Sequence, residues 1–276
     1  MIPRVARLVV AEFIKLSAHP FFYLAIAVLA VVIVVAEVLL PPVRSQNETL
    51  WKSFNSIQLF AYGFKFGLLL ASFVLLIFSS MMFAGEFDRG TIKNLLTRPI
   101  TRTDLFVAKC VTVLALAATL YLFVLYVSFL YAFVRGDLGS VWDDGQYIMH
   151  REYGELAGYA RKVVLVSFLP FLAAGFFGIL VSNWTDSSGY SVAIALVIYF
   201  IGYLITGWFS DAVQRYTLFY HITYGVEKLQ TWAEGGRTRW NPDVERGILY
   251  ATVPLAYMAG FVPVAYAIFR SRNINA

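Results

Sequence analysis

Six long apolar stretches, separated by shorter polar segments, dominate the pattern of this 276-residue chain. Each reaches the roughly 20 residues that a helix needs to cross a bilayer, and none alternates as the strands of a membrane barrel do. The sequence therefore predicts an all-α integral membrane protein built as a single transmembrane domain over residues 1–276. The expected spans are residues 21–40, 57–84, 104–134, 163–182, 189–209 and 248–269. The second and third exceed the bilayer thickness, so we expect them to tilt or to extend beyond it.

The composition agrees with a membrane setting. Of all residues 59% are hydrophobic and only 14% are charged, whereas a soluble domain carries about a quarter charged residues. Because so few charges cannot cover a surface exposed to water, lipid must solvate much of the chain. The net charge of +5 would also suit a nucleic-acid-binding protein. In a membrane protein this excess is typical of basic cytoplasmic loops, so we expect membrane lipid rather than nucleic acid as a partner.

Residues 3–18 show the pattern of an amphipathic helix. Its charged side, which also includes Leu8, holds Arg4, Arg7, Glu12 and Lys15. Its apolar side holds Ala6, Val9, Val10, Phe13 and Leu16. We expect an interfacial helix lying flat on the inner leaflet, with His19 and Pro20 turning the chain into the first span. The alternative is a plain basic flank that only sets the topology.

The distribution of charge predicts the orientation. With the N-terminus inside, the short inner segments are dense in Lys and Arg, while the longer outer loops, 135–162 and 210–247, balance basic with acidic residues. The positive-inside rule then places both termini in the cytoplasm, in a multi-pass protein of the cell (inner) membrane. In the second outer loop, aromatic residues recur at helical spacing and predict a short helix at the outer surface. They are Tyr216, Phe219, Tyr220 and Tyr224, which would serve as an interfacial aromatic belt or as a lid over substrate.

Motifs for a chemical step are missing from the sequence. There is no G-x-x-x-x-G-K-[ST] phosphate loop, no H-E-x-x-H and no G-x-S-x-G. The three histidines lack metal-ligand spacing, and Cys110 is interpreted as a small apolar filler rather than a reactive thiol. We therefore expect no enzyme activity, no metal and no cofactor in this chain.

Two kinds of residue inside the spans bear on packing. Glu37 and Lys65 are charged residues near the outer ends of the first two spans, and they either pair, snorkel separately or serve transport. Gly175 and Gly178 in the fourth span are typical of close helix–helix contact.

The segment 85–99, between the second and third spans, is compact and basic. On a helical wheel its polar side holds Glu86, Arg89, Gly90, Lys93, Asn94 and Thr97, and its apolar side holds Phe87, Ile92, Leu95 and Leu96. Pro99 would end this helix. Thr103 is expected to cap the next span, with Asp104 in its first turn. Composition alone leaves two hypotheses open, a helix that docks into a soluble motor and a solvated loop that satisfies the positive-inside rule.

A family resemblance favours the first hypothesis. The segment presents, in order, Glu86, Gly90-Thr91, Leu95-Leu96, Pro99, Arg102 and Lys109. This succession resembles the first cytoplasmic loop of permease subunits of the type-2 ABC exporters, and the six spans match as well. The resemblance implies a cytoplasmic coupling helix, a second permease half and separate ABC ATPase chains that carry ATP and Mg. It also implies an ATPase-docking surface made of Glu86, Asp88, Arg89, Gly90, Thr91, Lys93, Asn94 and Arg98.

The function expected from these observations is that of a permease subunit of an ATP-binding cassette exporter. It would move an amphiphilic or lipid-like substrate outward, using ATP hydrolysed by a separate subunit. One alternative is a membrane scaffold that recruits soluble proteins without transport. Another is an intramembrane enzyme, for which too few polar residues converge at membrane depth.

Overall fold

The computed structural model describes residues 2–39, 55–91, 100–136, 138, 141–142, 149–233 and 246–272. The helices described are α1 (Ile2–Ser17), α2 (Pro20–Leu39), α3 (Ser56–Asp88), α5 (Arg102–Arg135), α6 (Tyr153–Ser182), α7 (Ser188–Thr206), α8 (Asp211–Gln214), α9 (Leu218–Ala233) and α10 (Arg246–Ser271). Two short strands between α5 and α6, β1 (Val141–Trp142) and β2 (Met149–Arg151), pair antiparallel. The predicted all-α class is confirmed for the membrane part, and this hairpin is an addition that the sequence did not indicate.

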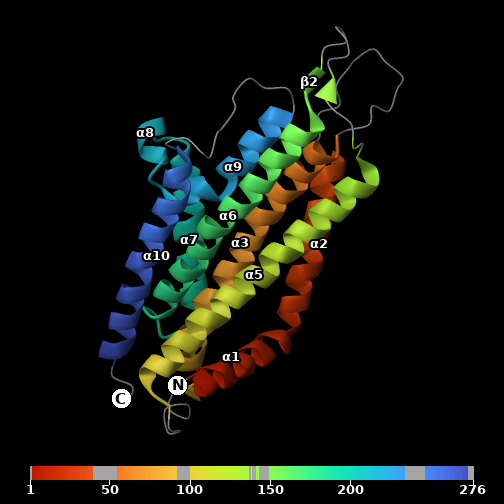
Figure 1. Cartoon of the computed structure of the whole chain (residues 1–276). Coiled ribbons are helices and arrows are strands. Elements are labelled where there is room, and N and C mark those ends of the chain that lie inside the picture. The colour runs from red at the N-terminus through yellow and green to blue at the C-terminus, as the bar shows by residue number, and fades with distance from the viewer. Residues whose placement is uncertain are drawn as a thin grey trace.

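Six of these helices are long and apolar enough to cross a bilayer, as the sequence predicted: α2, α3, α5, α6, α7 and α10. Figure 1 shows them as an elongated bundle. The start of α1 and the end of α10 lie at one end, called the α1 end below, and α8 and β2 lie at the opposite end, called the α9 end. α6 begins at Tyr153 rather than near residue 163, so part of the expected loop 135–162 is helical. That residues 1–276 form one domain stays a prediction.

The length of α7 matches a bilayer. Its 19 residues span about 28 Å at the usual helical rise, close to the hydrocarbon thickness of about 30 Å. Trp184 and Trp208 flank its two ends and are 68% and 89% exposed, as tryptophans at membrane–water interfaces are. α3 and α5, with 33 and 34 residues, are about 50 Å long and exceed that thickness.

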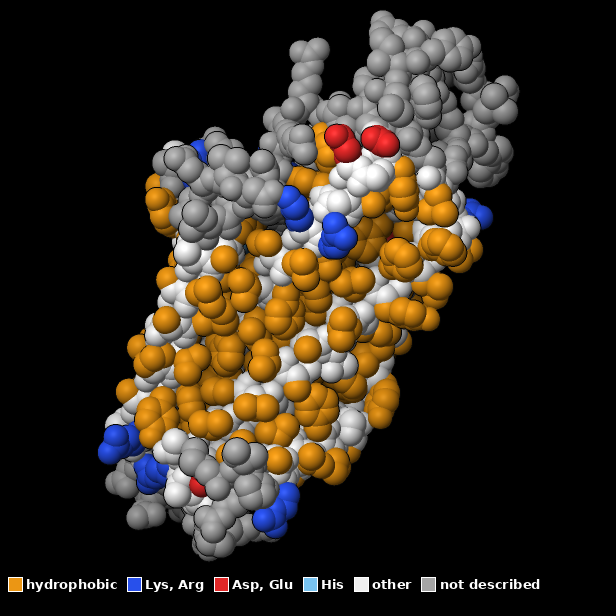
Figure 2. Space-filling model, viewed as in Figure 1, with side chains coloured by type: hydrophobic (Ala, Val, Ile, Leu, Met, Phe, Trp, Pro, Cys, Tyr) orange, Lys and Arg blue, Asp and Glu red, His pale blue; other side chains and the backbone are white. Residues whose placement is uncertain are grey.

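The surface has the character of one solvated by lipid. Apolar side chains cover the middle of the molecule in Figure 2, and the charged ones gather near its two ends. On α7, for example, Val197, Ile201 and Leu204 are about half exposed. Soluble proteins rarely expose apolar patches of this extent to water. In a bilayer the same side chains contact lipid tails, so exposing them carries no hydration penalty.

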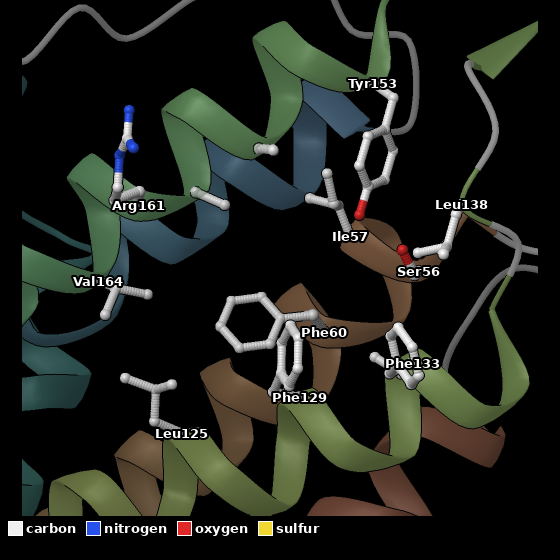
Figure 3. Close-up of a pocket in the computed structure, with 13 residues that line it drawn as sticks. Ser56, Ile57, Phe60, Leu125, Phe129, Phe133, Leu138, Tyr153, Arg161 and Val164 are labelled. Atoms are coloured by element: carbon white, nitrogen blue, oxygen red, sulfur yellow. The ribbon is translucent and has the colours of Figure 1, made fainter.

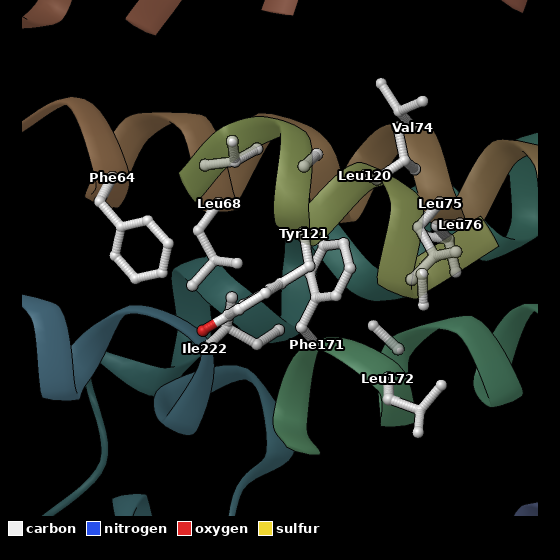
Figure 4. Packing of buried hydrophobic residues seen from close by; sticks show 14 of the residues in the cluster. Phe64, Leu68, Val74, Leu75, Leu76, Leu120, Tyr121, Phe171, Leu172 and Ile222 are labelled. Carbon is white, nitrogen blue, oxygen red and sulfur yellow. The ribbon is translucent and has the colours of Figure 1, made fainter. Parts of the chain in front are cut away.

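α3 lies at the centre of the bundle, where it contacts α2, α5, α6, α7 and α9. Figure 4 shows how Phe64 and Leu68 of α3 meet Tyr121 of α5 and Phe171 of α6. The Tyr121 ring lies 5.7 Å, centroid to centroid, from each of the two phenylalanine rings, and its hydroxyl donates to the carbonyl of Val164. Because α3 is buried on most of its faces, a movement of this helix must be shared by its neighbours.

The glycines of α6 confirm the predicted close contact. A Cβ at Gly178 would lie 1.9 Å from the Ser79 hydroxyl oxygen, and one at Gly175 would lie 2.9 Å from a methyl group of Val113. Both positions therefore require glycine for α6 to approach α3 and α5.

The predicted aromatic helix is present as α9, but it packs into the bundle against α6 and α3. Its Tyr220 and Tyr224 rings lie 4.3 Å apart, and Tyr224 stacks on Tyr250 of α10 at 5.7 Å. Trp232 contacts Tyr159 of α6 at 4.9 Å. These aromatic side chains also fill helix–helix contacts, and Tyr220 and Tyr224 are half-buried. Their place in an interfacial belt stays a prediction.

Candidate functional site

Four charged side chains from three helices meet at the α1 end. We call Glu12 and Lys15 of α1, Glu86 of α3 and Lys109 of α5 the charge quartet. Lys109 Nζ lies 3.0 Å from Glu86 Oε1 and 3.4 Å from Glu12 Oε2. Lys15 Nζ lies 2.7 Å from Glu12 Oε1 and 3.1 Å from Glu86 Oε1. Each lysine thus contacts both carboxylates, and the quartet joins α1 to the end of α3 and the start of α5.

Lys109 is fully buried, at 0% exposure. Its ammonium also donates to the backbone carbonyl of Met82 at 2.7 Å and lies 5.1 Å from the centroid of the Phe83 ring. A lysine ammonium has three protons, and here three acceptors face it. A buried charge persists only when it is paired and hydrogen-bonded in this way.

Burial and pairing act in opposite directions on the pKa values of Glu12 and Lys15, the two quartet residues of α1. Burial alone would raise the pKa of the Glu12 carboxyl, but the charge of Lys109 and the hydrogen bond from Lys15 hold that pKa below its ordinary value. Burial would lower the pKa of Lys15, but its contacts with Glu12 and Glu86 hold it above the ordinary value. Both groups are therefore charged near neutral pH.

The structure corrects the expected start of the helix in 85–99. Helix α3 continues through Asp88, with Arg89 as its C-cap, and Gly90 adopts a positive φ of 65° that ends it. A continuous helix from Glu86 onwards is therefore wrong, because the left-handed residue interrupts it. Lys93, Asn94 and Arg98 lie outside the described residues.

Among the described residues of the predicted docking surface, Glu86 is buried and the others are exposed. Glu86 is only 8% exposed and contacts the two lysines of the quartet. Asp88 is exposed, and its Oδ2 accepts from the Ser188 hydroxyl at 2.7 Å and from the Ser188 backbone N–H at 3.3 Å, at the first turn of α7. Arg89, Gly90 and Thr91 are exposed. Docking of an ATPase on these residues stays a prediction.

The end of α10 is tied to the same region. Arg272 pairs with Asp186 at 2.5 Å, donates to the Thr185 carbonyl at 3.2 Å, and stacks over the Phe87 ring of α3 at 4.1 Å. Arg102, at the start of α5, donates to the carbonyls of Arg270 and Arg272. These contacts link four segments at the α1 end: the end of α3, the start of α5, the α6–α7 connection and the end of α10.

One turn of α3 just before these contacts is held from three sides. The Ser182 hydroxyl of α6 accepts from the backbone N–H groups of Phe83 and Ala84, at 2.9 and 3.0 Å. Ser191 of α7 donates to the Ser80 carbonyl at 2.7 Å, and Lys109 of α5 donates to the Met82 carbonyl. A displacement of the α3 end would therefore be transmitted to α5, α6 and α7.

Sequence reasoning missed the charge quartet. It placed Glu12 and Lys15 on a solvated side of the first helix and treated Lys109 as part of a family pattern. A signal was present, because a lysine within an apolar stretch of a span requires an acidic partner.

The two charged residues near the far ends of the first spans do not pair with each other. Lys65 lies 3.3 Å from Glu227 of α9. Glu37 is 2% exposed and packs against Gly63, and neither of its carboxyl oxygens has a hydrogen-bond partner within the part of the chain that the structure describes. A search of the same part finds no cluster of His, Cys, Asp and Glu that could hold a metal ion.

Comparison with known proteins identifies a family. The family model described as "ABC-2 family transporter protein" matches residues 8–202, which run from α1 through most of α7. No curated protein matches the chain significantly.

Proposed function

Since the chain belongs to the ABC-2 family of transporter proteins, whose permease domains are membrane subunits, we propose that it is the permease subunit of an ATP-driven exporter. In this proposal a separate ABC ATPase chain, which carries ATP and Mg, docks at the α1 end on Arg89, Gly90 and Thr91 and on the residues that follow them. A second permease half completes the transporter.

The observation that carries the proposal is the place of the charge quartet. The exposed residues Arg89–Thr91 come directly after the α3 turn that holds Glu86, and Glu86 contacts lysines of both α1 and α5. A force applied at Arg89 acts on three helices at once, because the ion pairs of buried Lys109 with Glu86 and Glu12 cannot be exchanged for water without a large cost. This is the mechanical link that a motor below the membrane needs.

The proposal places the α1 end in the cytoplasm of a cell (inner) membrane protein, with α1 at the inner interface and both termini inside. Arg89, Arg102, Arg270 and Arg272 lie at this end, which agrees with the positive-inside rule. The substrate would be amphiphilic or lipid-like and would move outward. A chain with 17% aromatic residues can offer contacts to the apolar groups of such a substrate.

Co-purification tests the docking surface. The double variant Arg89→Glu/Lys93→Glu should release the ATPase chain encoded with this permease, while the permease itself still elutes as a folded protein in detergent. The matched control is Arg135→Glu, at the opposite end of α5, which should retain the ATPase. Undiminished co-purification of the double variant contradicts the docking role.

ATP hydrolysis separates a permease from a scaffold. In proteoliposomes, the ATPase should hydrolyse ATP at a different rate when it is bound to the permease, because the two are mechanically coupled. A scaffold would bind the ATPase and leave its rate unchanged.

Cysteine labelling tests the orientation. In a Cys110→Ala background, a single cysteine at Lys93 should react with an impermeant maleimide only from the cytoplasmic side, and one at Trp142 only from outside. The reverse pattern contradicts the proposed topology.

A further inference from the structure

An open apolar pocket lies at the α9 end between α3, α5 and α6, far from the charge quartet. Its volume is about 280 Å³, close to the lower bound of about 300 Å³ for small-molecule sites. Figure 3 shows Phe60 of α3, Phe129 and Leu125 of α5 and Val164 of α6 around its centre. Ser56, Tyr153 and Arg161 are the lining residues with polar side-chain groups.

The pocket borders a surface that faces lipid. Phe129 and Phe133 of α5 line it and are 58% and 55% exposed, and Leu122 and Tyr126, one to two turns along the same helix, are each 63% exposed. Apolar walls without partner atoms lose dispersion contacts, and water inside would gain few hydrogen bonds. A hydrocarbon chain therefore fills the pocket more favourably than water does.

Arg161 supplies the charge at this pocket. It is exposed, and it is the charged residue among those that line the cavity. Its guanidinium extends away from the apolar centre in Figure 3, so an acyl chain and an anionic head would occupy different ends of the site. Guanidinium groups bind phosphate through paired hydrogen bonds. The acids Glu152 and Glu155 stand at the very start of α6, nearer the loop, and would keep an anionic head at the level of Arg161.

We propose that this pocket binds an anionic phospholipid, with one acyl chain between α3, α5 and α6 and the phosphate at Arg161. The second acyl chain lies along the exposed α5 surface, where the Phe129 and Phe133 rings stack at 6.0 Å. A single-chain fatty acid would leave this surface uncovered. The site needs no ATPase partner, so it stands or falls separately from the proposed export function.

Photolabelling of the purified full-length chain tests the site. The probe is phosphatidylglycerol with a diazirine in one acyl chain, compared with phosphatidylcholine that carries the same chain. We expect phosphatidylglycerol to label peptides of α5 and α6 about tenfold more than phosphatidylcholine. Both lipids carry a phosphate, but the choline ammonium cancels its charge and weakens the attraction to Arg161 by about one charge-assisted contact. Equal labelling by the two lipids overturns the proposal, and so does labelling by diazirine-oleate that phosphatidylglycerol does not displace.

Two variants locate the contact. Arg161→Gln should abolish the preference for phosphatidylglycerol, while the control Arg215→Gln, on a basic residue that does not line the pocket, should retain it. Ala157→Trp should fill the cavity and reduce labelling by both lipids severalfold. If Ala157→Trp fails to fold, the Arg161→Gln comparison decides alone, because Arg161 is exposed and its loss should leave the bundle intact. A retained preference in Arg161→Gln overturns the proposal.

Discussion

Lys109 Nζ lies 3.0 Å from Glu86 Oε1, so an ion pair joins the end of α3 to α5. Lys109 is fully buried, and its Nζ also lies 3.4 Å from Glu12 Oε2 of α1. These three helices therefore depend on one another. The first prediction follows from this dependence.

Replacing Lys109 by methionine removes the charge that two carboxylates share. Glu12 and Glu86 would then face each other with only Lys15 between them, in a site with little water. The variant leaves two buried carboxylates to share one lysine, Lys15, whose side chain is 54% exposed. Breaking a buried ion pair costs about 3–5 kcal/mol, and we expect Lys109→Met to lose up to this amount of stability. Thermal unfolding in detergent measures it.

The matched control is Lys65→Met. Lys65 also lies in a span, but its partner Glu227 has a side chain that is 39% exposed, so we expect a loss of about 1 kcal/mol or less. If the two variants unfold at the same temperature, the Lys109 site is not the buried anchor described here.

The burial of His221 in α9 leads to a prediction about how the stability of the protein depends on pH. It is 1% exposed, its Nε2 lies 2.7 Å from the Arg215 carbonyl oxygen, and its Nδ1 lacks a hydrogen-bond partner among the described residues. The neutral ring therefore donates through Nε2. Burial lowers the pKa of His221 from 6.5 to about 4.

The sign follows from proton uptake. Between pH 6.5 and pH 4 the unfolded chain binds a proton at His221 and the folded chain does not, so stability falls as the pH is lowered through this window. The full loss is about 3 kcal/mol. Melting temperatures from pH 7.5 to pH 4.5 should show most of this loss for the native chain. His221→Gln retains the hydrogen bond to Arg215 without titrating, and a slope that persists in this variant assigns the effect to another group.

The six spans could be predicted from the sequence because the bilayer alone fixes the length and polarity of a crossing helix. The contacts at their ends could not, because they depend on residues far apart in the chain. Lys65 finds Glu227 rather than Glu37, and only the packing of α9 against α3 brings those two together. Glu86 looks solvated on a helical wheel and is buried because α1 covers it.

The N-cap residue of α5 was also predicted incorrectly from the sequence. The sequence predicted Thr103 as the cap, whereas the structure assigns Thr101, whose hydroxyl accepts from the Asp104 backbone N–H at 3.1 Å while Asp104 bonds back to Thr101. Thr103 instead bonds Tyr266 of α10 at 2.8 Å. Pattern alone cannot separate two threonines placed two residues apart, because the backbone angle at the cap decides between them.

This assignment gives a prediction for the start of α5. Thr101→Ala should cost about 1 kcal/mol, since it removes the cap and frees Asp104, whereas Thr101→Ser keeps the hydroxyl and should cost less than half of that. Unfolding in detergent compares the two variants. An equal loss for alanine and serine would mean that the methyl group, and not the cap, stabilises this end.

Gly63 and Glu37 provide the last prediction. A Cβ at Gly63 would lie 1.7 Å from Glu37 Oε1 and 2.7 Å from Glu37 Cγ, and Glu37 is too deeply buried to swing away. Gly63→Ala should therefore lose about 1–3 kcal/mol through overpacking. Glu37→Ala removes the three atoms nearest to that Cβ, which are Oε1, Cδ and Cγ of Glu37, so Gly63→Ala should cost little in a Glu37→Ala background.

A double-mutant cycle of these two positions measures their coupling, and Gly154→Ala is the control. A Cβ at Gly154 meets nothing within 4 Å, so alanine there should leave stability within about 0.5 kcal/mol or raise it through helix propensity. A coupling near zero between positions 37 and 63 would show that Glu37 leaves the α2–α3 contact, for instance by turning towards the membrane surface. A coupling of about 1–3 kcal/mol would mean that Gly63 is required because α2 brings a buried carboxyl against α3.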